Sequence, residues 1–370
     1  MPVSAVDCVQ PALQHTRDQL FRPFRFGQWS RLALVGFLAA ELHTSGCNFN
    51  GFNFPVSSHP RRGNDVVMPS MPFAHLDAAR IGQFVVLIVA AIALAIVLGV
   101  VFLYIGSVFR FILFDSVLKK HCSISEGWHL WHRAGRRYFL WQVVLLIAEG
   151  LFLGVLIGVP LALAAVLGWF NNADQHIVRT VLGVICLIGL FLLFALLAGA
   201  VQLLAKDFLV PIMALEDVDF ADGWSRLLAL IRPEPGRYVV YLLLKIVLAI
   251  AAAIVFGILT LIPLLALVVP AVLAVFAGYK AGLGWNVTTV SLAIISGTIL
   301  IAILVYLVAL ISVPATVFFP AYAIYFFAAR YPRLDALLNP APPAPELPPV
   351  IESLSPPEPP SLPPAPEAIS

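Results

Sequence analysis

The sequence is short of charge. Asp, Glu, Lys and Arg make up 11% of its residues, whereas a soluble globular domain carries roughly 25%. The apolar share is 61% and the mean hydropathy is +0.96, so the chain has few polar side chains with which to face water. This composition excludes an ordinary soluble domain and predicts a polytopic membrane protein. The net charge of +2 gives no indication of nucleic-acid binding.

Cysteine is scarce as well. The cysteines show neither close pairing nor CxxC spacing, so no disulfide framework is expected. They are Cys8, Cys47, Cys122 and Cys186. Residues 1–20 are polar, and we expect no cleavable signal there. The run Leu32–Cys47 ends in TSGC and loosely resembles a lipoprotein cleavage site, but Glu41 and His43 interrupt its end, which favours a retained membrane segment.

Long apolar runs dominate the rest of the sequence. A membrane span needs about 20 apolar residues, and five runs reach this length with ease. A sixth, weaker run, Phe26–Leu42, contains Arg31 and would make a short, tilted or re-entrant helix. Prolines inside the longer runs predict bends or re-entrant segments at Pro160, Pro263 and Pro270. We therefore predict an all-α transmembrane bundle of about six spans. The five strong runs are Phe84–Phe109, Phe139–Phe170, Val178–Leu204, Val239–Pro263 and Val287–Val313.

Basic residues are distributed unevenly between alternate loops. With the N-terminus inside, sixteen of the 22 Lys and Arg residues fall in cytoplasmic segments, five in external segments and one, Lys245, in a span. The positive-inside rule then predicts that both termini are cytoplasmic, in a bacterial inner membrane. The predicted organisation is a cytoplasmic segment over 1–25, a transmembrane domain over 26–335 and a tail over 336–370. From Leu338 onward the tail holds thirteen prolines and no Lys or Arg, so we expect disorder.

An arginine and two aromatic rings recur at three span starts. The second and third copies read GRRYFLW and PGRYVVY. Each copy stands where an outward helix is expected to enter the membrane, so that the guanidinium reaches lipid phosphate and the rings share one face. We predict that these residues anchor the helices at the headgroups, or that the arginines form a basic collar for anionic lipid. The anchor residues are Arg25, Trp29, Arg137, Tyr138, Trp141, Arg237, Tyr238 and Tyr241.

The cytoplasmic connectors, over residues 110–138 and 206–237, also correspond. Each contains a helix-start signature, SISEGW at 123–128 and DFADGW at 219–224, in which a capping residue is followed by an acid three positions later. The helices that follow are predicted to be short, amphipathic and interfacial. The incoming helices end in FRFILFD, KDFLVPIM and VFFPAYAI. The predicted architecture is three repeated hairpins, with an external loop over residues 44–80 in the first.

These motifs carry a family resemblance. The FRPFRFGQW entry, the Gly- and Asn-rich loop, FRFILFD, the two Gly-Trp helices and DFLVPIM resemble a family of uncharacterised bacterial multi-span membrane proteins. They are similar to the membrane domain attached to some glycerophosphoryl diester phosphodiesterases. The resemblance covers roughly residues 15–335 and implies a membrane bundle without a settled activity. A phosphodiesterase would need a soluble barrel, whereas His132-Arg133 lies in an amphipathic connector with no strand pattern.

Few ionisable residues lie inside the predicted spans. Glu149 and Lys245 stand at depths that differ by one helical turn in equivalent outward helices, so we expect them to pair. His129 and His132 share a helix face, but the corresponding residues of the second connector are not metal ligands. No metal site, cofactor or catalytic residue is therefore predicted.

These observations favour a non-catalytic bundle that organises membrane lipids, anionic lipids included, or a partner protein. Transport of a small solute or a lipid is the alternative, because the prolines in the long runs could break helices near the midplane. A membrane-embedded enzyme is the third hypothesis. A homo-oligomer is left open, and no nucleic-acid partner is expected.

Overall fold

The structure is a computed structural model that describes residues 4–39, 78–166, 177–282, 284 and 286–339. Most of the expected external loop over 44–80 and nearly all of the tail over 336–370 lie outside these ranges. No strand occurs in the described ranges, so the all-α prediction is confirmed. In chain order the helices are α1 (Val9–Phe21), α2 (Phe26–Leu38), α3 (Ala78–Leu118), α4 (Ile124–Val166), α5 (Ile177–Leu204), the π-helix η5 (Ala205–Leu209), α6 (Val210–Glu216), α7 (Phe220–Ile231), α8 (Pro235–Lys280), α9 (Val287–Ala328) and α10 (Pro332–Leu338).

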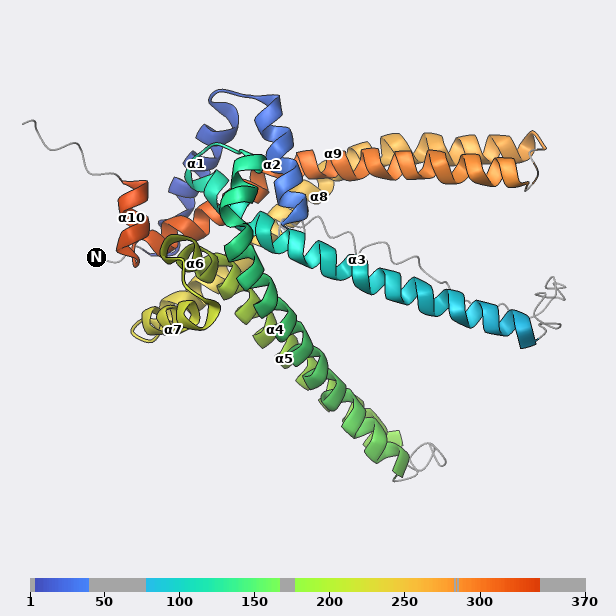
Figure 1. The fold of residues 1–370 in the computed structure, drawn as a ribbon, viewed down its shortest axis with the longest axis horizontal. Helices are drawn as coiled ribbons and strands as arrows, with labels where there is room; N and C mark the ends of the chain where they lie inside the picture. The colour runs from blue at the N-terminus through green and yellow to red at the C-terminus, as the bar shows by residue number, and fades with distance from the viewer. Residues whose placement is uncertain (1–3, 40–77, 167–176, 283, 285, 340–370) are drawn as a thin grey trace, which may run out of the picture.

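The helices form a body with three arms (Figure 1). The body contains α1, α2, α6, α7 and α10 together with the adjoining ends of the long helices. One arm is α3 alone, the second is the pair α4 and α5, and the third is the pair α8 and α9. The arms diverge from the body, and the first and last helices both lie in the body.

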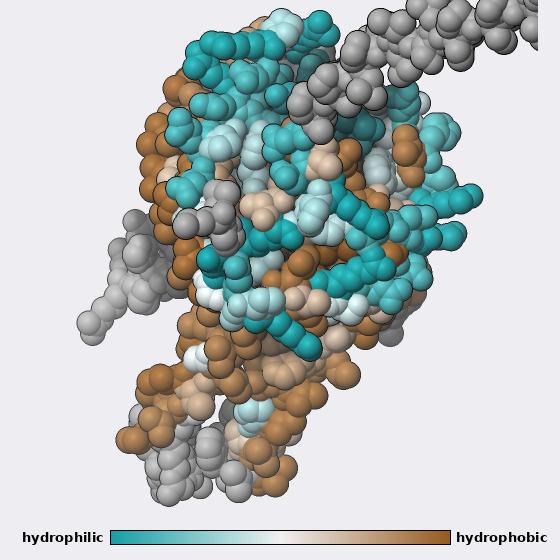
Figure 2. All heavy atoms as spheres, turned by 90° about the vertical axis from the view of Figure 1, so that its left-hand side faces the viewer, coloured by the Kyte–Doolittle hydropathy of each residue, from teal (hydrophilic) through white to brown (hydrophobic). Residues whose placement is uncertain are grey.

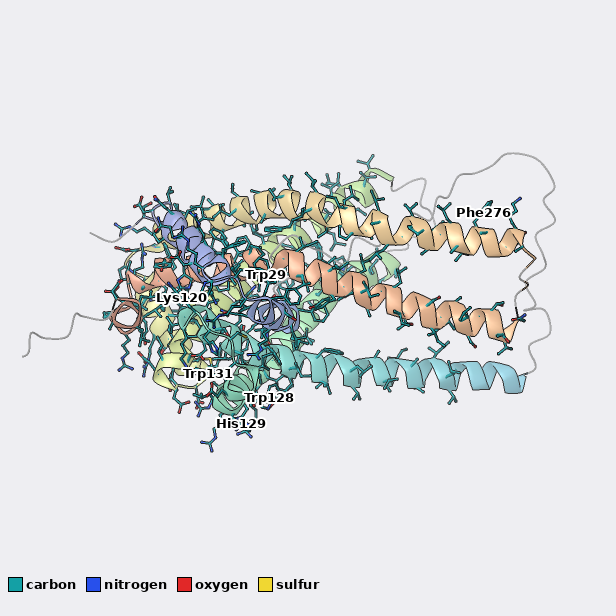
Figure 3. The ribbon with its side chains drawn as sticks, turned by 90° about the horizontal axis from the view of Figure 1, so that it is seen from above. Trp29, Lys120, Trp128, His129, Trp131 and Phe276 are labelled. Atoms are coloured by element: carbon teal, nitrogen blue, oxygen red, sulfur yellow. The ribbon has the colours of Figure 1, made fainter. Side chains whose placement is uncertain are left out.

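Polar residues gather on the body and apolar residues on the arms. Seen end-on, the surface of the body is largely hydrophilic, whereas the parts that extend away from it are hydrophobic (Figure 2). Figure 3 places Trp29, Trp128 and Trp131 in the body and Phe276 near the far end of α8. A membrane boundary imposes this division, because the hydrocarbon core accepts apolar helices and excludes polar surface.

Within the described residues, five helical segments are long and apolar enough to cross a membrane. The sequence predicted about six, and the sixth run corresponds to α2. This helix has 13 residues, which at 1.5 Å per residue gives about 20 Å, shorter than a hydrocarbon core of about 30 Å. Its residues Leu32, Val35 and Gly36 are buried in the body. The described part of α2 is therefore a packing helix and not a full span.

The two connectors fold differently. The first predicted amphipathic helix is continuous with the span that follows it, so that α4 runs for 43 residues. The second is a separate helix, α7, which ends at Ile231. Proline explains the difference, because Pro233 and Pro235 interrupt the second connector whereas the first has no proline between its Gly-Trp pair and its arginines. The prediction of a separate short helix holds for the second connector and is wrong for the first.

The internal prolines do not break the long helices. α8 runs unbroken through Pro263 and Pro270, and α4 runs through Pro160. The predicted re-entrant segments are therefore absent from these two helices. A membrane helix accommodates proline because neighbouring groups and local adjustment satisfy the freed carbonyl.

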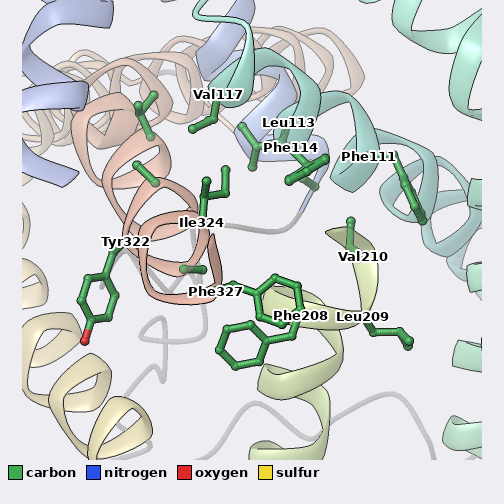
Figure 4. Close-up of a cluster of buried hydrophobic side chains, with 14 of the residues drawn as sticks. Phe111, Leu113, Phe114, Val117, Phe208, Leu209, Val210, Tyr322, Ile324 and Phe327 are labelled. Atoms are coloured by element: carbon green, nitrogen blue, oxygen red, sulfur yellow. The ribbon is translucent and has the colours of Figure 1, made fainter. Parts of the chain in front are cut away.

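The hydrophobic core lies where the incoming helices reach the body. Figure 4 shows side chains of α3, of the η5 and α6 turn, and of α9 packed together. They come from the motifs FRFILFD, KDFLVPIM and VFFPAYAI, which the sequence indicated as matching helix ends. Phe111, Phe208, Tyr322 and Phe327 are fully buried here. The three motifs therefore supply the packing that holds the arms to one body.

Glycine allows α3 and α4 to approach closely. A Cβ atom on Gly135 would lie 2.6 Å from Val108 Cγ2 and 2.9 Å from Val108 Cα. The second of these neighbours is backbone, so α3 itself would have to move. Gly127 and Gly223, of the two Gly-Trp pairs, approach Ile112 and Leu209 in a similar way.

The N-terminal segment also belongs to the body, which the sequence did not indicate. Helix α1 packs against α9 and buries Ala12, His15 and Leu20. His15 Nε2 lies 2.9 Å from the carbonyl oxygen of Val117, and His15 Nδ1 lies 3.2 Å from Tyr325 OH. A neutral imidazole satisfies both contacts, donating from Nε2 and accepting at Nδ1.

We expect Gly135→Ala to destabilise the junction of α3 and α4 by about 1–3 kcal/mol, because the added methyl group overpacks it. The matched control is Gly150→Ala on the same helix, where a Cβ atom would meet nothing within 4 Å. Thermal unfolding in detergent measures both. Equal melting temperatures for the two variants would contradict the close approach.

The stability of α1 docking should fall as the pH falls. Burial lowers the pKa of His15, and its hydrogen bond to Val117 opposes this effect in part. Below the ordinary histidine pKa of about 6.5, the undocked imidazole takes up a proton that the docked imidazole does not, so docking is fully stable above that pH and weakens below it. The melting temperature should therefore drop between about pH 7 and about pH 5. His15→Gln should flatten this dependence and His129→Gln should keep it; the same slope in both would exclude His15 as the cause.

Candidate functional site

A buried ion pair joins the second and third arms at the body. Lys245 Nζ lies 2.6 Å from Asp207 Oδ1 and 2.5 Å from Asp207 Oδ2. Tyr241 OH donates to Asp207 Oδ2 at 2.8 Å. Lys245 is 1% exposed and Asp207 is 6% exposed. Both charges are thus enclosed by protein, and the carboxylate is fixed by contacts from α8.

The π-helical turn η5 presents the carboxylate. A π turn closes its hydrogen bonds over five residues instead of four, and such turns are frequent at functional sites. Here it follows the apolar α5 directly and places Lys206 and Asp207 on the wall of one cavity. The next residue, Phe208, points into the core, where it packs against Tyr238 and Tyr241. One turn therefore supplies both charge and packing.

A buried ion pair is costly to keep. Each ion loses several kcal/mol of hydration, and the attraction between the ions often only balances this loss. Apolar residues of the same size would serve stability at least as well. Charged residues within membrane segments generally mark functional sites, and we therefore take Lys245 and Asp207 as the centre of the candidate site.

Two spaces lie beside the ion pair. A cavity of about 30 Å³, which is room for a water molecule or a small ion, has Asp207, Lys245, Arg110 and Lys206 in its lining. A groove of about 390 Å³ lies between α3, α4 and α5, and Arg110 and Lys206 line it as well. Its apolar wall includes Leu103, Trp141, Leu145, Leu146 and Leu203.

Polar side chains in and beside the groove are held by their neighbours. Gln202 Nε2 donates to both oxygens of Glu149, at 3.0 Å and 3.1 Å. Ser107 Oγ donates to Gln142 Oε1 at 2.6 Å. These contacts join α4 to α5 and α3 to α4. The polar side chains Gln142, Glu149 and Gln202 of the groove wall are thus each held by a hydrogen bond.

Glu149 and Lys245 do not form the predicted pair. Lys245 bonds Asp207, and Glu149 accepts from Gln202. The prediction compared how far Glu149 and Lys245 stand from the starts of two outward helices. In the structure, however, the part of α8 that carries Lys245 contacts η5, which follows the incoming helix α5. The expected Glu149–Lys245 contact is therefore wrong: Lys245 belongs to the centre of the candidate site, and Glu149 lines the groove beside it.

The predicted aromatic anchors are mostly core residues. Tyr138, Tyr238 and Tyr241 are at most 2% exposed, and Trp141 stacks on Phe220 with ring centroids 4.8 Å apart. The expectation that these rings face lipid headgroups is wrong, because the body packs around the start of each outward helix. Trp29 is half-buried, and its Nε1 donates to the carbonyl of Leu310.

The three arginines of the repeated motif have different surroundings. Arg137 forms exposed ion pairs with Asp217 at 3.0 Å and with Asp219 at 3.1 Å. Arg237 pairs with Glu234 at 3.0 Å. Arg25 is exposed at the N-cap of α2. Contact of these arginines with lipid headgroups, as single anchors or as a collar, stays a prediction.

Sequence reasoning missed Asp207. The signal was available, since Lys206 and Asp207 directly end the apolar run Val178–Leu204. Their position at the predicted cytoplasmic end of a span suggested that both side chains are hydrated. In the structure, however, the body buries Asp207. His129 and His132 form no site either: His132 Nδ1 lies 2.8 Å from the carbonyl of His129. Among the described residues no group of three His, Cys, Asp or Glu side chains is placed to hold a metal ion.

The fold and the site define an all-helical, multi-span integral membrane protein with a charged centre at one end of its spans. Residues 3–337 match the model of a family of unknown function, DUF7544, and the chain belongs to this family. No curated protein and no solved structure matches the chain.

Removal of either charge of the ion pair should be strongly destabilising. We expect Lys245→Met or Asp207→Leu to cost about 3–5 kcal/mol, because each leaves the other group buried without its partner. The double variant Asp207→Leu/Lys245→Met should recover most of this loss. Lys280→Met, at the exposed end of the same helix, is the control. Thermal unfolding in detergent gives the comparison, and additive losses in the double variant would argue against a coupled pair.

Proposed function

We propose that this protein is a non-catalytic bundle that binds and organises phospholipid in the leaflet next to the body. The observation that carries the proposal is the groove between α3, α4 and α5. Arg110 and Lys206 line it beside the body, apolar side chains make up much of the rest of its wall, and Glu149, which accepts from Gln202, is the carboxylate in this lining. A phospholipid has the same division, with a charged headgroup and long apolar chains.

The exposed arms support the same conclusion. From Val85 to Val89 of α3, five consecutive side chains are 53% to 69% exposed. Five residues exceed one helical turn, so this part of α3 is exposed on every side. In a membrane its surface must be covered by acyl chains or by another protein. Lipid beside α3 would continue from the groove along the arm.

The hydrophilic surface of the body supports the orientation that we propose. The hydrophilic body carries the segments in which most of the basic residues fall (Figure 2). We therefore place the body, and with it both termini, in the cytoplasm of a bacterial cell. The groove then opens at the cytoplasmic leaflet, where anionic lipids attract basic residues.

Transport is the second candidate function. It is favoured by one observation, the pairing of Asp207 with Lys245 in a π turn inside an apolar bundle. Ionisable residues at such positions line ion and substrate paths in transporters. The similarity of the sequence to a membrane domain of phosphodiesterases stays a prediction, and the lipid-binding proposal rests on the groove.

The groove can be filled without changing its charges. Gly199 of α5 lines the groove and has nothing within 4 Å of an added Cβ, so Gly199→Phe should occupy the space of an acyl chain. Gly189→Phe is the matched control on the same helix, also with nothing within 4 Å and outside the groove lining. We expect gently extracted wild-type protein and Gly189→Phe to retain phospholipid in native mass spectrometry, and Gly199→Phe to lose it.

Equal lipid retention by the two phenylalanine variants would contradict lipid binding in the groove. Proteoliposomes loaded with small labelled solutes test the alternative. Solute flux that depends on Asp207 and Lys245, without lipid retention, would favour transport. Melting temperatures of both variants show whether either has unfolded.

A further inference from the structure

Positive charge gathers where the cavity meets the groove. Three cationic side chains line the cavity, those of Arg110, Lys206 and Lys245, and Asp207 is the one carboxylate in this lining. Lys245 bonds Asp207 at 2.5 Å. Arg110 and Lys206 also line the groove. Glu149 is the carboxylate in the groove lining, so the two linings together hold three cations and two carboxylates, and the excess positive charge favours an anion over a cation at their junction.

We infer that Arg110 and Lys206 form a binding site for a phosphate group at this junction. The inference rests on the proposed lipid function and names the part of the lipid that is recognised. The phosphate lies between α3 and η5, and the acyl chains follow the apolar wall of the groove. Charge-assisted hydrogen bonds of this kind are strong where water is scarce.

The guanidinium of Arg110 is oriented by the protein. Its Nη1 donates to Tyr138 OH at 2.8 Å, and its Nε lies 3.4 Å from the carbonyl of Ala39. A guanidinium presents five N–H donors in a planar fork that matches phosphate, and a lysine adds a point charge on a flexible stem. A planar guanidinium and a lysine ammonium together suit a tetrahedral anion.

The sequence places the two cations at equivalent positions. Residues 110–128 and 206–224 align without a gap, and both segments end in Gly-Trp. Arg110 and Lys206 are the first residues of these two segments. A basic residue thus recurs at the same place on two incoming helices. This recurrence is a second observation that points to the same two residues, independent of the cavity.

A phosphate on a lipid fits the surroundings better than a small free anion. The wall changes from charged to apolar within the same groove, from Arg110 and Lys206 to Leu146 and Leu203. A molecule that binds both cations and lies against these leucines must therefore carry an anionic group and hydrocarbon, and Glu149, held by Gln202, also lines the groove. A phosphodiester offers two non-bridging oxygens, one for each cation. Inorganic phosphate shares the anionic chemistry and is separated from lipid by experiment.

Titration of lipid-stripped protein with two lipids tests the site. The probes are phosphatidylglycerol and a diacylglycerol with the same acyl chains, which lacks phosphate, and native mass spectrometry reads binding. We expect Arg110→Gln and Lys206→Gln each to weaken phosphatidylglycerol binding about fivefold and to leave diacylglycerol binding unchanged. Arg110→Lys and Lys206→Arg, which keep the charge, should retain most of the affinity. Arg136→Gln, an exposed arginine of α4 outside both linings, is the control.

The outcomes separate the phosphate site from the lipid function. If phosphatidylglycerol binding weakens in the two glutamine variants and in no other variant, the result supports both the phosphate site and the lipid function. If inorganic phosphate raises the melting temperature of the wild type but not of these variants, and neither lipid binds, the anion site stands and the lipid function fails. Equal loss in Arg136→Gln, or no loss in any variant, overturns the phosphate site. Gly199→Phe then still decides whether the groove holds lipid.

Discussion

A charge buried inside protein needs an opposite charge within reach, and this requirement fixes how the second and third arms meet. Lys245 belongs to the third arm and Asp207 to the end of the second, so the pair can form only when α8 lies against η5. Tyr241 adds a third bond from the same helix. The aromatic packing of Phe208 on Tyr238 and Tyr241 follows from this register. Loss of the pair would therefore affect the junction of two arms and not one side chain alone.

The body is densely packed, whereas the arms are not. In the body, buried aromatic rings and close glycine contacts such as Gly135 on Val108 give dense packing. In the arms, long apolar helices leave most side chains exposed. Helices in lipid gain little from apolar contact with one another, so the arms need no dense interface. Under the proposed function, lipid would cover these surfaces as well as bind in the groove.

Much of the fold could be predicted from the sequence, because hydropathy and the placement of basic residues determine where membrane helices lie. The spans, the helix starts at Ser123 and Asp219 and the matching aromatic helix ends all follow from local pattern. The site was harder to predict, because a sequence pattern does not show which helix end packs against which. Tyr138 and Tyr241 have the composition of an interfacial belt but are buried by the body. Asp207 was overlooked since it stands at a boundary that only the tertiary structure encloses.

Transport would require the buried ion pair to rearrange, whereas lipid binding would not. Transport requires two arrangements of the site that open to opposite sides. Lys245 and Asp207 would have to separate or move together, and an unpaired buried charge costs about 3–5 kcal/mol. α8 is also unbroken through Pro263 and Pro270, whereas transporter sites commonly use interrupted helices. Lipid binding needs no such change, because the groove lies beside an intact ion pair and shares with its cavity the two cations Arg110 and Lys206.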